Sequence, residues 1–307
     1  MIKDIPNGVY PTMVTPFTDD NKVDFNALEQ LIGWYVERGV AGLFAICQSS
    51  EIFYLSTEEK LEILKFIMKN APKGLSIIAS GHTADDLDTQ IEEAKMYIDT
   101  GIDAYVFISN RFAKQEDSDE VFLKNMNYVI DALPEVALGV YECPYPYKRL
   151  LTPAIIKELA NGGRFRFLKD TCCDIDQIQA KLDAAKGSNF KIYNANCALL
   201  LESMNIGCAG FSGVMANFTP ELYAEICDIY QTNPERAKII QDFVGFSSLA
   251  EGQVYPVNAK YYMSLEGVDI KINTRSKDIS LFPRNRAVEI DQMHATTLLF
   301  KEYLKTI

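Results

Sequence analysis

Histidine is scarce in this chain of 307 residues, which contains only His82 and His294. A histidine-based catalytic triad or a multi-histidine metal site is therefore hard to assemble. We expect His82 to be a loop or cap residue and His294 to be solvated. The seven cysteines are an odd number without a CxxC pair, so free thiols are expected rather than a disulfide framework. The adjacent Cys172 and Cys173 are expected to be structural.

The sequence also lacks long apolar runs and clusters of basic residues. No stretch approaches the length that would span a bilayer, and the N-terminus MIKDIPNGVYPTMVTPF has no secretory signal pattern. A cytoplasmic protein is expected. The formal net charge of -12 opposes binding to nucleic acid or to anionic membranes. A small molecule is the expected partner, since a few local cations or backbone amides can still bind an anionic substrate.

What the chain does contain is a regular alternation of short apolar runs and amphipathic stretches. The run GVYPTMVTPF (8–17) precedes a helical pattern over 24–39, in which Asp24 is a plausible N-cap and Gly39 a plausible terminator. The next run, AGLFAIC, precedes a helix that Ser56 opens with a capping-box spacing. Each pair is one βα unit.

The same unit recurs to a total of eight, which predicts an α/β fold of the (β/α)8 TIM-barrel type over residues 1–231. Residues 232–307 are predicted to form a C-terminal helical extension. A doubly wound sheet would want a Gly-rich turn after its first strand, and TPFTDDN has none. The remaining predicted strands are LSIIAS (75–80), with a helix from about Thr83 after it, DAYVFIS (103–109), VALGVYEC (136–143), RFRFLKD (164–170), FKIYNA (190–195) and CAGFSG (208–213).

Two polar residues close apolar strands, where the catalytic groups of barrels lie. Lys169 ends RFRFLKD, and burial at a barrel mouth would favour its neutral amine, which can attack a carbonyl to form an imine. The spacing alone leaves open, and slightly favours, a structural lysine paired with Asp170 or extended to solvent. Tyr141 ends VALGVYE and is a candidate acid or base, although its position taken alone favours an aromatic cap on the barrel core.

The segment CQSSE closes the second predicted strand. The hydroxyls of Ser49 and Ser50 are candidates to relay a proton or, with loop amides and Gln48, to bind a carboxylate. Two serines there would ordinarily satisfy turn backbone instead. Glu51 is expected to be structural and to bind loop amides.

Several segments together resemble the dihydrodipicolinate synthase and N-acetylneuraminate lyase family. They run in order from GVYPTMVTPF and VDFNAL through CQSSE, YECP and FLKD to GFSGVMANFTPEL and YPVNAKYYM. The resemblance implies a barrel with a C-terminal helical extension, a homo-oligomer that is usually a tetramer, and 2-oxo acid chemistry without a metal or organic cofactor. It places Lys169 at the imine-forming lysine and Tyr141 at the proton-shuttling tyrosine. Ser212, in GFSGVMANFTPEL, is included among the substrate-binding candidates.

The chain departs from the pattern of dihydrodipicolinate synthases in three places. Asn110 and Arg111 stand where those enzymes have paired tyrosines, one of which completes a relay across the subunit interface. Pro146 stands in the place of the arginine for the distal carboxylate of aspartate semialdehyde. Of the family's carboxylate-binding motif, only Ser49 and Glu51 keep equivalent chemistry. Arg111 and Arg149 are nearby candidates for an anionic substrate group.

The sequence therefore favours a Schiff-base lyase that acts on pyruvate or a 2-oxo sugar acid by aldol cleavage, condensation or dehydration. Dihydrodipicolinate synthase itself and a catalytically silent metabolite sensor on the same barrel are the alternatives. An unrelated phosphate-binding barrel isomerase ranks last, because CAGFSG offers few glycines for phosphate.

Overall fold

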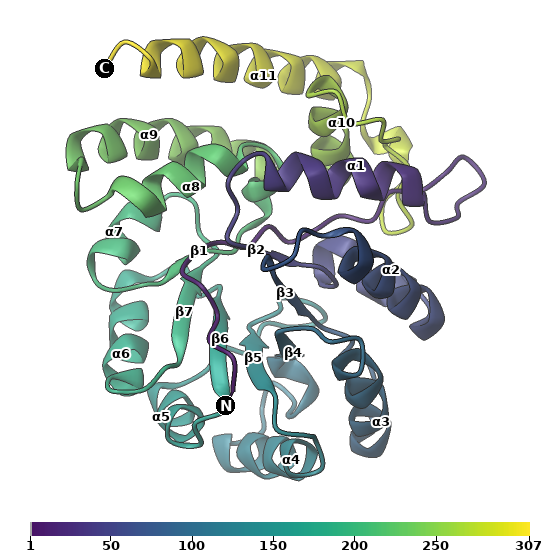
Figure 1. Ribbon diagram of the computed structural model, residues 1–307, viewed down its shortest axis with the longest axis vertical. Coiled ribbons are helices and arrows are strands. Elements are labelled where there is room, and N and C mark those ends of the chain that lie inside the picture. The colour runs from purple at the N-terminus through teal and green to yellow at the C-terminus, as the bar shows by residue number, and fades with distance from the viewer. Residues whose placement is uncertain (1) are drawn as a thin grey trace.

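Eight parallel strands form one sheet in the computed structural model, which describes residues 2–307 (Figure 1). Neighbouring strands follow the order β1-β8-β7-β6-β5-β4-β3-β2. The sheet closes because the Ala41 N–H donates to the Val9 carbonyl at 3.0 Å and the Phe44 N–H donates to the Pro11 carbonyl at 3.0 Å. The (β/α)8 prediction is confirmed. The strands are β1 (Gly8–Val9), β2 (Gly42–Phe44), β3 (Ser76–Ala79), β4 (Ala104–Ile108), β5 (Ala137–Tyr141), β6 (Phe165–Asp170), β7 (Lys191–Asn194) and β8 (Gly210–Phe211).

A helix follows each strand, and Figure 1 shows these helices arranged around the strands. The Asp24 side chain caps the first helix by accepting the N–H groups of Asn26 and Ala27, as its position in the sequence predicts. The barrel helices are α1 (Phe25–Val36), α2 (Thr57–Asn70), α3 (Leu87–Ile98), α4 (Asp119–Asp131), α5 (Pro153–Asn161), α6 (Ile175–Ala185), α7 (Leu200–Asn205) and α8 (Pro220–Ile229).

Two elements begin or end elsewhere than expected. Helix α3 begins at Leu87 rather than near Thr83, because the Asp86 side chain accepts the Thr89 N–H and so caps the helix there. Only Gly8–Val9 of the apolar run 8–17 is strand. Prolines within that run cannot donate to a sheet ladder, and the later residues contribute only two isolated bridges, from Thr12 to Phe44 and from Phe17 to Val23.

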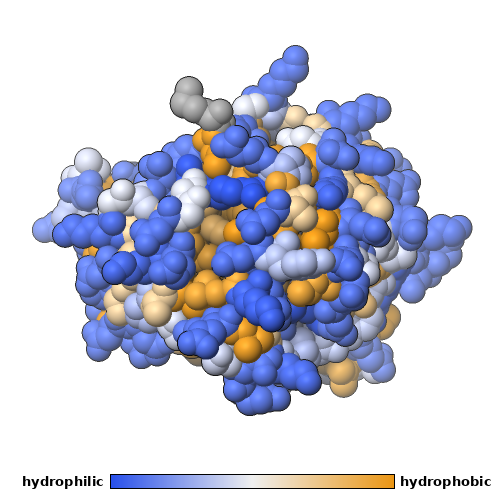
Figure 2. Space-filling model, turned by 90° about the horizontal axis from the view of Figure 1, so that it is seen from below, coloured by the Kyte–Doolittle hydropathy of each residue, from blue (hydrophilic) through white to orange (hydrophobic). Residues whose placement is uncertain are grey.

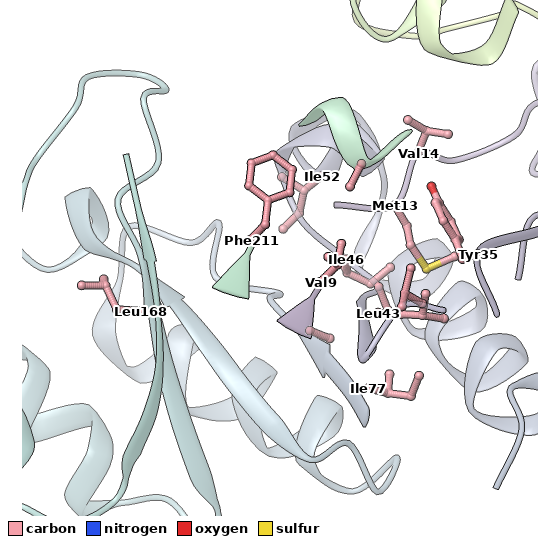
Figure 3. Close-up of a cluster of buried hydrophobic side chains, with 14 of the residues drawn as sticks. Val9, Met13, Val14, Tyr35, Leu43, Ile46, Ile52, Ile77, Leu168 and Phe211 are labelled. Carbon is pink, nitrogen blue, oxygen red and sulfur yellow. The ribbon is translucent and has the colours of Figure 1, made fainter. Parts of the chain in front are cut away.

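The two faces of the strands pack into different layers. Phe167 belongs to the cluster inside the barrel, whereas Leu168 belongs to the layer between the strands and the helices. Figure 3 shows part of that outer layer, with Leu43 and Ile46 near Tyr35 and with Leu168 at a distance on β6. Because side chains alternate along a strand, Lys169 points inward with Phe167, and its neighbour Asp170 points outward.

The C-terminal extension contains the helices α9 (Pro234–Ser247), α10 (Val257–Leu265) and α11 (Arg284–Leu304), which lie on the α1 and α8 side of the barrel (Figure 1). The segment between α10 and α11 returns to the barrel. No helix within residues 2–307 has the length and apolar character needed to cross a membrane. The face in Figure 2 is mostly hydrophilic, with hydrophobic residues exposed between the polar ones.

Both histidines form hydrogen bonds with other side chains of the protein. His82 lies in a loop, as expected, but it is fully buried: its Nδ1 accepts the Ile108 N–H at 2.8 Å, so its Nε2 donates to Gln90 at 2.7 Å. Burial lowers the pKa of His82 to about 4. The expectation that His294 is solvated is wrong, because its Nε2 lies 2.7 Å from a carboxylate oxygen of Glu266. All seven cysteines are free thiols.

Candidate active site

Lys169 and Tyr141 meet inside the barrel mouth. They close the adjacent strands β6 and β5 and are direct partners in the parallel register. The Lys169 Nζ lies 4.5 Å from the centre of the Tyr141 ring, and both residues are buried. The structure thus brings together the two residues that the sequence singles out as strand-ending polar groups.

The Lys169 amine is buried without a polar partner. Only 3% of the residue is exposed, and among residues 2–307 no hydrogen-bond acceptor or carboxylate pairs with its Nζ. Asp170, the partner considered from the sequence, binds Lys181 instead. Burial lowers the pKa of Lys169, while the nearby Cys47 thiol and the Glu251 carboxylate act in the opposite direction. This environment favours the neutral, nucleophilic amine.

The Tyr141 phenol is held by an amide. Its hydroxyl donates to the Gln48 Oε1 at 3.0 Å, and the Cys143 thiol donates to the same oxygen at 3.4 Å. Burial raises the pKa of Tyr141, and the thiols of Cys143 and Cys47 add to the rise. The phenol is therefore protonated at neutral pH and can donate a proton or a hydrogen bond to a bound substrate.

The loop after β2 contains two short helical turns, of which the first, Gln48–Ser50, borders the cavity. The Ser50 hydroxyl accepts the Cys47 N–H at 3.1 Å and donates to the Met13 carbonyl at 2.7 Å, so Ser50 shapes the turn rather than facing the cavity. The Ser49 hydroxyl donates to the Thr12 hydroxyl at 3.0 Å and lines the cavity. At the start of such a turn the first backbone N–H groups have no partner within the turn, which leaves donors near Ser49.

Glu51 connects this loop to the C-terminal extension. One carboxylate oxygen accepts the Arg275 and Ser276 N–H groups, both at 2.7 Å, and the other lies 3.2 Å from the Nζ of Lys260. Glu51 and Lys260 are both buried. The expectation that Glu51 binds loop amides is confirmed, and the loop that it binds is 224 residues away in the sequence.

A cavity of about 440 Å³ opens above these residues. Its volume is within the range of small-molecule sites and exceeds the needs of a three-carbon acid. Several polar residues of the cavity lining were not predicted from the sequence. Those just after β6 and β7 could have been found, because they follow the end of an apolar strand, but no local sequence pattern marks those in the C-terminal extension. The missed polar residues are Tyr54, Tyr145, Lys148, Thr171, Cys173, Asn196, Glu251, Tyr255, Ser276 and Lys277.

Besides Ser50, three predicted binding residues lie outside the cavity lining. Arg149 is buried and donates to the carbonyls of Lys114 and Asp117, so its guanidinium holds a loop. Arg111 lies behind the cavity residue Phe53, 5.3 Å from the ring centre, and pairs with an aspartate. Ser212 is fully buried and donates to a carbonyl of the barrel interior. These contacts correct the sequence-based assignment of all three residues to substrate.

Asn110, at the position of the family's paired tyrosines, has a structural role. Its side-chain amide donates to the carbonyls of Cys143, Tyr145 and Tyr147 and so holds the loop that follows Tyr141.

Within the part of the chain that the structure describes, no three His, Cys, Asp or Glu side chains are grouped so as to hold a metal ion.

Known proteins match this chain along most of its length. A sequence model of the Dihydrodipicolinate synthetase family matches residues 5–277. A 4-hydroxy-tetrahydrodipicolinate synthase of Clostridium perfringens (strain SM101) is 26% identical over 223 residues, which cover 73% of this chain and 75% of the relative. The crystal structure of a dihydrodipicolinate synthase from Bacillus anthracis has a TM-score of 0.86 at 17% identity and covers 96% of this chain and 99% of its own. YagE of E. coli K12, solved in complex with pyruvate, has a TM-score of 0.84 at 20% identity, with 97% and 98% covered.

Proposed function

This chain belongs to the dihydrodipicolinate synthetase family, and on that premise we propose that it is a lyase that forms a Schiff base between Lys169 and a 2-oxo acid. The substrate is pyruvate or a 2-oxo sugar acid, and the reaction is an aldol cleavage, an aldol condensation or a dehydration. The observation that carries the proposal is the buried Lys169 amine, which no acceptor or carboxylate within residues 2–307 engages. The family relative YagE, crystallised with pyruvate, supports the substrate class.

The covalent step uses the lone pair of Lys169. The neutral amine attacks the carbonyl carbon of the 2-oxo acid, and the carbonyl oxygen takes one proton from the attacking nitrogen and a second from the Tyr141 phenol. The C–O bond then breaks, water leaves, and the nitrogen keeps its remaining proton in a protonated imine. A free lysine, with a pKa of roughly 10.4, needs about 4 to 5 kcal/mol to be neutral at pH 7. Burial at the barrel mouth removes part of that cost before the substrate arrives. The protonated imine then accepts electrons from the neighbouring carbon, which stabilises the carbanion.

Tyr141 is the proton donor and acceptor in this proposal. Its protonated phenol lies beside the Lys169 amine and can give a proton to the departing carbonyl oxygen. Gln48 orients the phenol through the hydrogen bond to its amide oxygen. The carboxylate of the substrate binds the Ser49 hydroxyl and the backbone N–H groups of the turn.

Reductive trapping tests the proposal. The protein is incubated with pyruvate and borohydride, and the product is analysed by intact mass and peptide mapping. We expect one covalent adduct on Lys169, and Lys169→Ala abolishes it while the fold is retained. Lys148→Ala is the matched control, because Lys148 also lines the cavity and donates to the Thr171 carbonyl. Loss of the adduct in the control variant alone, or an adduct on another lysine, contradicts the proposal.

A metabolite sensor without turnover is the second candidate, and one contact favours it. The Tyr141 phenol donates to an amide oxygen, and an amide does not pass a proton on as a hydroxyl does. Tight binding of pyruvate without a trapped adduct would identify the sensor. Turnover of pyruvate with aspartate semialdehyde would identify a true dihydrodipicolinate synthase, which Pro146 at the arginine position opposes. A panel of keto-deoxy sugar acids tests the remaining substrates.

A further inference from the structure

Behind the Lys169 and Tyr141 pair lies a buried group of three charged side chains. Glu142 directly follows Tyr141, and Asp170 directly follows Lys169. Because side chains alternate across a strand, these two carboxylates point away from the barrel interior, toward the helix layer. There they meet Lys181 of α6, and none of the three side chains is more than 1% exposed. The same two strand ends thus carry the Lys169–Tyr141 pair on their inner side and a group of three charged side chains on their outer side.

The contacts of this group bind several segments together. The Lys181 Nζ donates to the Glu142 Oε1 at 2.6 Å and also to the Asp170 Oδ2. Glu142 accepts in addition the Leu151 N–H at 2.8 Å and the Thr171 N–H at 2.9 Å. One ammonium and two carboxylates therefore fix the ends of β5 and β6, the loop after each of them, and α6.

We propose that Lys181 is a positioning residue, which holds Tyr141 and Lys169 in their reactive arrangement by binding the carboxylates that follow them. The proposal rests on the Schiff-base function proposed above. Lys181 does not line the cavity, so it acts through the strand ends and not on the substrate. A misplacement of about 1 Å between reacting groups can cost a factor of about 100 in rate, which makes the register of the two strand ends consequential.

Electrostatic stabilisation alone does not explain this group. Burial raises the pKa of Glu142 to about 7, and the Asp170 carboxylate contributes to that rise. Burial by itself lowers the pKa of Lys181, but Glu142 and Asp170 raise it overall. Replacing a buried ion pair by apolar residues of similar volume is often neutral or stabilising, so a gain in folding stability does not by itself account for this group. Its contacts instead fix the geometry of the two strand ends.

The test is the double variant Asp170→Asn/Lys181→Met. It removes one positive and one negative charge, so the net charge behind the strands is unchanged, and Glu142 keeps its two backbone donors. We expect the rate constant of reductive trapping at saturating pyruvate to fall by at least about tenfold. The half-saturating pyruvate concentration should stay within about threefold, because the carboxylate loop after β2 is untouched. The single variant Lys181→Arg, which keeps the positive charge, should retain most of the wild-type trapping rate.

The controls separate this inference from its premise. The exposed pair Lys238–Asp242 on α9 is substituted in the same way, and trapping should stay at the wild-type rate. Wild-type trapping by a folded double variant, judged by near-ultraviolet circular dichroism, overturns the positioning role alone. Absence of any adduct in the wild type overturns the Schiff-base function and this inference with it. If the double variant does not fold, Glu142→Asp replaces it in the experiment. Glu142→Asp keeps all three charges but moves the carboxylate away from Lys181. An unchanged trapping rate in this variant again overturns the proposal.

Discussion

Removal of the Lys260 charge is expected to destabilise the protein strongly. The Nζ of Lys260 lies 3.2 Å from Glu51 and donates to the Asn273 carbonyl at 2.5 Å, and neither charged side chain is more than 1% exposed. Lys260→Met leaves the Glu51 carboxylate buried without its counter-charge, which costs about 3 to 5 kcal/mol.

The size of the expected thermal shift follows from the length of the chain. With an unfolding entropy of about 2.1 cal/mol/K per residue, that loss lowers the Tm of the 307-residue chain by about 5 to 8 °C. Differential scanning calorimetry measures the shift. Lys238→Met, which breaks an exposed pair, should cost no more than about 1 kcal/mol.

A double-mutant cycle tests the reasoning more strictly. Glu51→Gln/Lys260→Met removes both buried charges, while the glutamine oxygen still accepts the N–H of Arg275 or Ser276. We expect this variant to recover much of the stability that Lys260→Met loses, with a coupling energy of about 1 to 3 kcal/mol. If Lys260→Met shifts the Tm no more than Lys238→Met does, the buried pair is not what fixes the segment, and the argument fails.

Three further predictions concern the cavity and its supports. The trapping rate should rise with pH, because only the neutral amine of Lys169 reacts. Since burial lowers the pKa of Lys169, the rise should level off below the pH of about 10 that is typical of lysine. A rate that still increases above that pH contradicts the buried environment assigned to Lys169. Tyr141→Phe should retain the trapped adduct but reduce turnover by about 10² to 10⁴-fold in steady-state assays, and an unchanged turnover would remove Tyr141 from proton transfer. Arg149→Met should lower the free energy of unfolding by about 3 kcal/mol in denaturant titrations, because carbonyls such as that of Lys114 lose their donor. Its half-saturating pyruvate concentration should not change, and a large increase would return Arg149 to the substrate site.

The sequence predicts best what depends on neighbours along the chain. The Asp24 cap and the capping box of Ser56 and Glu59 form as their spacing predicts, because all the atoms involved lie within one helical turn. The eight-fold alternation likewise predicts the barrel. Lys169 and Tyr141 could be singled out because a polar residue at the end of an apolar strand is visible without any knowledge of its partners.

The sequence predicts poorly what depends on distant partners. Arg149 has the chemistry of an anion site, yet the carbonyls that occupy it belong to a loop more than thirty positions away. His294 lies in the mostly polar terminal helix α11, where a histidine is expected to be solvated, and only the fold places Glu266 beside it. The ion pairs of Glu142 and Asp170 with Lys181 could not be predicted for the same reason, because Lys181 lies on the following helix and no local pattern connects the three residues.

The link between Glu51 and the segment at Arg275 also has a consequence for how the protein is made. Glu51 and the segment that follows Arg275 both contribute to the cavity lining, and the ribosome synthesises them at very different times. A ribosome adding about 5 to 20 residues per second releases the later segment roughly 10 to 45 seconds after Glu51. Until then the Glu51 carboxylate has neither its two N–H donors nor the Lys260 ammonium, so the cavity at the mouth of the nascent barrel is incomplete. A chain truncated before residue 257 would stay at that stage.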